Sequence, residues 1–246
     1  SALEHPNICN VHEVDETSDG QLFIVTALYD GAPLNEKVGQ APLNLQEALN
    51  VAIQISEGLA AAHEKGIVHR DIKSSNIMVT GKGRVVIMDF GLARKTDATK
   101  LTKTGATVGT IPYMSPEQAR GEKVDHRTDI WSLGVVLHEM VTGRLPYESA
   151  YSEAVVYSIL NEDPKPLTAL RSDVPMELER IVRKAMEKDR NTRYQTAIDL
   201  LADLRRLQRE FTFGGISRSP IRTSAFNRRR LYIYGGLSAL TTMVVA

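Results

Sequence analysis

Residues 69–76 read HRDIKSSN, and residues 89–91 read DFG. Apolar, β-branched runs on both sides of a GKG turn at residues 81–83 separate the two motifs, a pattern typical of a β-hairpin. A hairpin at this point folds Asp89 back towards Asn76. The sequence therefore predicts that side chains from both motifs gather in one small region.

Two more motifs follow, SPE at residues 115–117 and DIWSLG at residues 129–134. Residues 129–141 are apolar around much of a helical circumference, which is typical of a helix buried in a core. Between the DFG and SPE motifs, residues 92–112 have no sustained apolar period and predict a long loop. Long loops inside compact domains tend to be functional. Further helices are predicted near residues 151–160, 176–187 and 196–209.

Upstream, residues 21–27 form a short apolar run that suits a buried strand, and residues 30–33 read as a turn. Asn44 followed by Glu47 predicts a capped helix start, and Gly66 marks the end of that helix. The pattern as a whole predicts a mostly helical α+β domain with small sheet elements.

The composition excludes several functions. Lys plus Arg and Asp plus Glu both number 30 in 246 residues, so net charge gives no reason to expect a nucleic-acid partner. The single cysteine, Cys9, cannot form an internal disulfide, and a reducing compartment fits best.

Taken together, the motifs resemble those of eukaryotic-type (Hanks-type) serine/threonine protein kinases, from residue 5 to about residue 208. The resemblance implies a protein kinase-like α+β fold. It consists mostly of the helical C-terminal lobe, together with the last strands of the N-terminal lobe and the hinge. It also implies ATP and Mg²⁺ as cofactors, and proteins with Ser or Thr acceptors as substrates.

The resemblance also implies roles for single residues. Asp71 orients the acceptor hydroxyl and accepts its proton, and Lys73 places positive charge beside the transferred phosphoryl group. Asn76 and Asp89 offer the oxygen ligands that Mg²⁺ prefers, and Asn76 also counts among the catalytic residues. Lys73 together with Thr110 favours Ser/Thr over Tyr acceptors.

By the same resemblance, residues 21–34 match the hinge, with Thr26 as the gatekeeper. The Ala27 carbonyl and the Tyr29 amide are expected to meet the adenine edge, with Met78 as the floor of the pocket. The family often has an acidic residue where Ala27 stands, but the adenine contact uses backbone groups, so this departure changes little.

Other matches imply structural roles. Glu117 is expected to pair with a buried arginine, for which Arg193 is the candidate, and Asp129 is expected to anchor the catalytic loop. His69 and Phe90 are expected to be packed side chains rather than catalytic groups. Thr102 and Thr104 are candidate phosphorylation sites in the long loop.

The two ends predict a longer protein. The family's glycine-rich loop, strand lysine and helix glutamate are not found before the hinge, so we expect this piece alone to be inactive. Residues 1–210 are assigned to a kinase domain with a truncated small lobe, and residues 211–230 to a juxtamembrane linker. Residues 231–246 lack charge and follow three arginines, which predicts the start of a truncated transmembrane helix.

Kinase, linker and span in this order resemble bacterial receptor-type kinases. The resemblance implies a cytoplasmic kinase domain anchored to the membrane, and a homodimer in which one copy phosphorylates the other. The alternative is a pseudokinase or scaffold that uses the fold for binding alone. Against it, Asp71, Lys73, Asn76 and Asp89 are all present, whereas a scaffold has no chemical need for the whole set.

Overall fold

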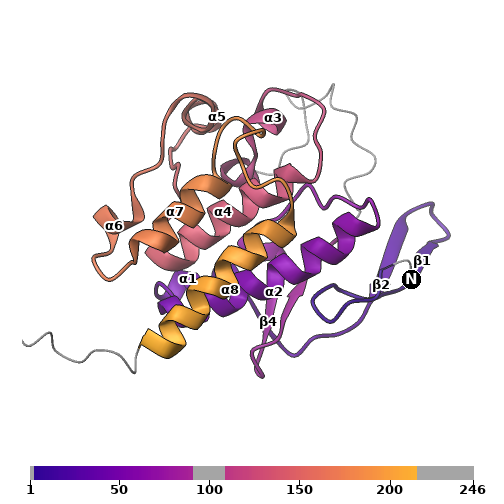
Figure 1. Ribbon diagram of the computed structural model, residues 1–246. Helices are drawn as coiled ribbons and strands as arrows, with labels where there is room; N and C mark the ends of the chain where they lie inside the picture. The colour runs from indigo at the N-terminus through magenta and orange to yellow at the C-terminus, as the bar shows by residue number, and fades with distance from the viewer. Residues whose placement is uncertain (1–2, 91–108, 215–246) are drawn as a thin grey trace, which may run out of the picture.

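The structure, a computed structural model, describes residues 3–90 and 109–214 (Figure 1). The strands are β1 (Val11–Glu16), β2 (Leu22–Thr26), β3 (Gly31–Pro33), β4 (Ile77–Thr80) and β5 (Val85–Ile87). The helices are α1 (Leu34–Gln40), α2 (Leu45–Glu64), α3 (Pro116–Ala119), α4 (Arg127–Thr142), α5 (Ser152–Asn161), α6 (Leu167–Leu170), α7 (Met176–Ala185) and α8 (Ala197–Gly214). Two 3₁₀ turns, η1 (Ser74–Asn76) and η4 (Ile111–Tyr113), lie beside the site described below.

A helical core carries the site. Helix α2 packs along α8 on one side and against α4 on another, and α4 also packs on α7 (Figure 1). Almost every side chain of α4 is buried, including Trp131, which confirms the predicted core helix. The helices predicted near residues 151–160, 176–187 and 196–209 are also confirmed, as α5, α7 and α8.

Helix α2 begins and ends where the sequence predicts. The Asn44 side chain accepts a hydrogen bond from the Glu47 N–H at 2.9 Å, which satisfies one of the free donors of the first turn. At the other end Gly66 has φ of 70°, a left-handed conformation that suits glycine and stops the helix.

The predicted hairpin of residues 77–80 and 84–88 is confirmed. Strands β3, β4 and β5 form an antiparallel sheet in that order, and β4 and β5 are its hairpin. The predicted turn at residues 30–33 is wrong, because Gly31 begins β3 and pairs with Thr80. A Cβ at Gly31 would lie 2.3 Å from the Val79 carbonyl oxygen, so this glycine serves close backbone approach.

The strand predicted at residues 21–27 is confirmed as β2, but it is not buried as predicted. Phe23, Ile24 and Val25 are 41%, 37% and 40% exposed. The reason is that β1 and β2 form a two-stranded antiparallel sheet that projects from the helices in Figure 1. In the described part of the chain no further strand extends this sheet.

Several predictions lie outside the described residues. These are most of the predicted loop at residues 92–112, including Thr102 and Thr104, and the segment at residues 231–246. Helix α8 continues to Gly214, which is past residue 210, the predicted end of the domain. Within residues 3–90 and 109–214, no helix combines the length and the apolar character needed to cross a bilayer.

A buried ion pair joins two distant parts of the chain, as the sequence predicts. Arg193 donates to both Glu117 oxygens, at 2.8 and 3.1 Å, and the two side chains are 0% and 3% exposed. Burial raises the pKa of Glu117, but the hydrogen bonds and charge of Arg193 outweigh it and leave the pKa below its ordinary value. Arg193 also donates to the Arg127 carbonyl at 2.8 Å, which ties the pair to the start of α4.

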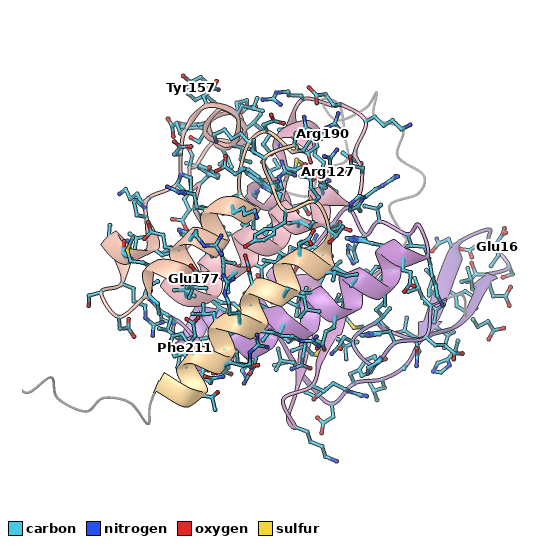
Figure 2. The ribbon with its side chains drawn as sticks, in the orientation of Figure 1. Glu16, Arg127, Tyr157, Glu177, Arg190 and Phe211 are labelled. Carbon is cyan, nitrogen blue, oxygen red and sulfur yellow. The ribbon has the colours of Figure 1, made fainter. Side chains whose placement is uncertain are left out.

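We predict that Glu117→Gln lowers the free energy of unfolding by about 3–5 kcal/mol, because Arg193 is left buried without a partner charge. The control is Glu177→Gln (Figure 2), which removes a partly exposed carboxylate that pairs with Arg180 on α7 and with Arg206 on α8, and should cost about 0–1 kcal/mol. Chemical denaturation at neutral pH measures both, and equal losses would contradict the assignment.

The stabilisation by the Glu117–Arg193 pair should depend on pH. Because the folded-state pKa of Glu117 is lowered, its contribution is present above the ordinary carboxyl pKa and is lost as pH falls through the folded value. The difference in stability between the unmodified chain and Glu117→Gln should therefore shrink in acid.

Candidate active site

Asp129 anchors the loop that carries the HRD motif. Its carboxylate is fully buried and accepts the N–H groups of His69 at 2.8 Å and Arg70 at 2.7 Å. The ring Nε2 of His63 donates to the same carboxylate at 2.8 Å. A buried carboxylate needs such donors, and here two of them belong to the loop itself, so the predicted anchoring role is confirmed.

The loop is held in an unusual conformation at Arg70, whose φ is 70°. A residue with a Cβ rarely adopts this left-handed region, and such strain of about 1–3 kcal/mol persists only when the surroundings enforce it. The bond from the Arg70 N–H to Asp129 supplies part of that enforcement and sets the direction in which Asp71 leaves the loop.

The predicted catalytic residues meet at Asp71. Its Oδ2 accepts from Lys73 Nζ at 2.9 Å and from Asn76 Nδ2 at 3.1 Å. Its Oδ1 is buried and has no hydrogen-bond partner among the described residues. The Asp71 carboxylate, whose side chain is 32% exposed, is thus held through one oxygen only. Lys73 Nζ also donates to Thr110 Oγ1 at 2.7 Å, which brings together the two residues that favour Ser/Thr acceptors.

The geometry of Asn76 fits a metal-binding role. Its amide nitrogen donates to the Asp71 backbone oxygen at 2.9 Å and to Oδ2, which fixes the orientation of the amide. No described residue donates to Asn76 Oδ1, so this oxygen is free to act as a ligand. The Met88 N–H donates to the Asn76 carbonyl at 2.8 Å, which closes the hairpin immediately before the exposed Asp89.

An amide oxygen and a carboxylate are suitable Mg²⁺ ligands, and Mg²⁺ is commonly held by one or two carboxylates together with substrate phosphates. Among the described residues no group of three or more His, Cys, Asp or Glu side chains is arranged to hold a metal. Asn76 and Asp89 have the chemistry of Mg²⁺ ligands, and the predicted metal site at these two residues stays a prediction.

His69 is a packed residue, as the sequence predicts. Its ring lies edge-on to Phe90, with centroids 4.6 Å apart. Ring Nε2 faces the Met88 carbonyl at 2.8 Å and so carries the proton, while Nδ1 accepts from the Asp71 N–H at 3.2 Å. Both ring nitrogens are occupied, so His69 is not placed to act as a general base.

The hinge presents free backbone groups. The Ala27 N–H donates to the Asn10 carbonyl at 3.0 Å, and the Tyr29 hydroxyl accepts from the Asn10 N–H at 3.2 Å. Within the described part of the chain, neither the Ala27 carbonyl nor the Tyr29 N–H has a hydrogen-bond partner. Met78 lies half-buried on β4, paired with Pro33 and Val86. The predicted adenine contacts remain a hypothesis.

A polar cluster beside the loop was not predicted from the sequence. Glu139, on α4, accepts from the Tyr113 hydroxyl at 2.8 Å and from Ser74 Oγ at 3.2 Å. Burial raises the pKa of Glu139, and these hydrogen bonds only partly offset the effect. The available signal was a carboxylate inside an otherwise apolar helix, which is costly unless hydrogen-bonded.

Residues 1–203 match the protein kinase domain, so the chain belongs to the protein kinase family. It is 41% identical over 212 residues to the serine/threonine-protein kinase PknB of Mycobacterium leprae, covering 84% of this chain and 34% of that protein. It is 37% identical over 206 residues to the serine/threonine-protein kinase PrkC of Bacillus subtilis, covering 83% of this chain and 32% of that protein.

These similarities confirm the resemblance drawn from the motifs, and with it the kinase-like α+β fold. The chain spans about a third of the length of the curated relatives it matches.

We predict that Asp71→Asn, made in the longer protein expected to contain this chain, lowers phosphate transfer roughly 10²–10⁴-fold while Mg-ATP binding survives. The physical reason is that Asp71 acts on the acceptor hydroxyl, not on the nucleotide. Asp89→Asn is the contrasting variant and should weaken Mg-ATP binding itself. Turnover on a Ser/Thr peptide and calorimetric nucleotide binding measure the two effects. Unchanged turnover of Asp71→Asn would refute the assignment.

Proposed function

We propose that the protein containing this chain transfers the γ-phosphate of ATP to Ser and Thr hydroxyls of other proteins. The main support is the arrangement at Asp71, where Lys73 and Asn76 hold one carboxylate oxygen and the other is left without a partner among the described residues. Membership of the protein kinase family, and relatives named as serine/threonine kinases, agree with this proposal.

In this proposal each residue has one task. The Asp71 carboxylate accepts a hydrogen bond from the acceptor hydroxyl, directs the hydroxyl oxygen at the phosphorus and takes the hydroxyl proton late in the transfer. Lys73 stabilises the negative charge of the transferred group, while its bond to Thr110 keeps its ammonium group beside Asp71. Mg²⁺, held by Asn76 and Asp89, would neutralise the phosphate charge.

The nucleotide base is assigned to the hinge. We infer that the Ala27 carbonyl accepts from the adenine amino group and that the Tyr29 N–H donates to a ring nitrogen, with Met78 beneath the ring. The support is that both backbone groups lack partners in the described chain. The groups that would grip the phosphates from above, a glycine-rich loop and a strand lysine, are not found in residues 1–20.

We predict that the 246-residue chain by itself has no appreciable kinase activity. Phosphoryl transfer depends on holding the γ-phosphate in line with the acceptor, and a misplacement of about 1 Å can cost 10²-fold. The test compares this chain with a version extended upstream, on a generic Ser/Thr substrate with labelled ATP. Activity only in the extended version supports the proposal. Equal activity in both contradicts the prediction, and inactivity in both favours a binding scaffold.

We further propose that residues 211–230 link the kinase domain to a membrane span beginning at residue 231. The support is the run of three arginines at residues 228–230 followed by uncharged residues, since cytoplasmic flanks of spans are rich in Lys and Arg. The arrangement would place the kinase domain in the cytoplasm and bring two copies close enough for mutual phosphorylation.

For this topology, we predict that the kinase domain is protected from protease added to intact cells and is cleaved once the cells are opened. An antibody against residues within α8 reports the cleavage. Cleavage by external protease in intact cells would overturn the proposed orientation.

A further inference from the structure

Gln118, on α3, forms hydrogen bonds with two separate parts of the site. Its Oε1 accepts from the Ser115 N–H at 3.0 Å and from Thr128 Oγ1 at 3.0 Å. Its Nε2 donates to the Arg70 carbonyl at 2.8 Å. The first of these bonds completes a capping box at the start of α3, but the last one leaves the helix and reaches the catalytic loop.

The Arg70 carbonyl belongs to the peptide that leads into Asp71. The N–H of this peptide donates to His69 Nδ1 at 3.2 Å, and the Gln118 amide is the only described donor to its oxygen. The preceding peptide is already held by the bond from the Arg70 N–H to Asp129. Gln118 thus restrains the strained Arg70 at its carbonyl, while Asp129 restrains it at its N–H.

The amide side chain of Gln118 meets both demands of this position. The Ser115 N–H needs an acceptor and the Arg70 carbonyl needs a donor, at the two ends of one planar group. A carboxylate has acceptors only, and an ammonium group has donors only. The choice of residue at position 118 is therefore explained by contact with the catalytic loop and not by helix capping alone.

We propose that Gln118 is a positioning residue that fixes the direction of Asp71 through the Arg70 carbonyl. The proposal rests on the phosphotransfer function proposed above. Glu117, the residue before Gln118, is bound by Arg193 in the core, so Gln118 extends from a rigid support. In this way the start of α3 is joined directly to the catalytic loop.

The test is Gln118→Glu in the extended, active protein. The glutamate keeps the acceptor for the Ser115 N–H but loses the donor and sets a carboxylate oxygen against the Arg70 carbonyl. We expect kcat to fall about tenfold, the effect of one hydrogen bond of ordinary strength, with KM for ATP and the thermal midpoint little changed. A kcat within twofold of the unmodified protein would overturn the proposal.

A matched control is available in Gln54. Its Nε2 donates to the Gly83 carbonyl at 3.0 Å and its Oε1 accepts from the Val85 N–H at 2.9 Å, at the turn of the β4–β5 hairpin. Gln54→Glu therefore makes the same chemical change to the same kind of double contact, away from the catalytic loop. We expect its kcat to match that of the unmodified protein. A loss of kcat equal to that of Gln118→Glu would show a general effect of the substitution and overturn the proposal.

A second variant protects the test against a folding defect. Gln118→Lys keeps a donor towards the Arg70 carbonyl but loses the acceptor for Ser115 and Thr128. We expect it to be the less stable of the two variants at position 118 and to retain the higher kcat. The reverse order of kcat would overturn the proposal.

A measurement without catalysis separates this inference from the proposed function. In the 246-residue chain, amide hydrogen exchange of Arg70 and Asp71 should be about tenfold faster in Gln118→Glu than in the unmodified chain and unchanged in Gln54→Glu. If the unmodified extended protein transfers no phosphate, the proposed function fails, and the exchange rates still decide the role of Gln118. Equal protection in both variants would overturn the positioning role.

Discussion

The candidate site depends on one buried carboxylate, that of Asp129. In an apolar helix this charge is tolerated only because the backbone of the catalytic loop and the His63 ring donate to it. The dependence is mutual, since the loop holds its left-handed Arg70 only while the carboxylate binds the adjacent N–H groups. The contacts of Asp71 with Lys73 and Asn76 depend on this loop conformation.

A second buried charge, that of Arg193, holds residues 115–118 beside the same helix, α4. Arg193 binds Glu117 and also the carbonyl of Arg127, and Thr128 binds the Gln118 amide. The first turn of α4 therefore holds two segments. Asp129 holds the catalytic loop, while the Arg127 carbonyl and Thr128 hold residues 115–118 through Arg193 and Gln118. Gln118 then joins the two segments directly, which makes the arrangement a closed ring of contacts.

Much of this could be predicted from the sequence because the chemistry is local. The HRDIKSSN stretch places Asp71, Lys73 and Asn76 within six residues, so almost any compact loop brings them together. The Asn44 cap and the β4–β5 hairpin are likewise set by residues a few positions apart. The prediction that Glu117 pairs with Arg193 came from the resemblance to a family and not from spacing.

The predictions that were wrong or missing concern contacts between residues far apart in the sequence. Gly31 was predicted in a turn because the strand it packs against lies far along the chain, and β2 was predicted as buried because an apolar run does not say whether another layer covers it. Gln118 and Glu139 looked like ordinary polar residues of helices. The sequence by itself determined the family and the longer helices, and it predicted the catalytic groups. Only the tertiary structure decided what holds the loop that carries Asp71, because the bonds with Asp129 and Gln118 join residues tens of positions apart that meet only when the core has packed.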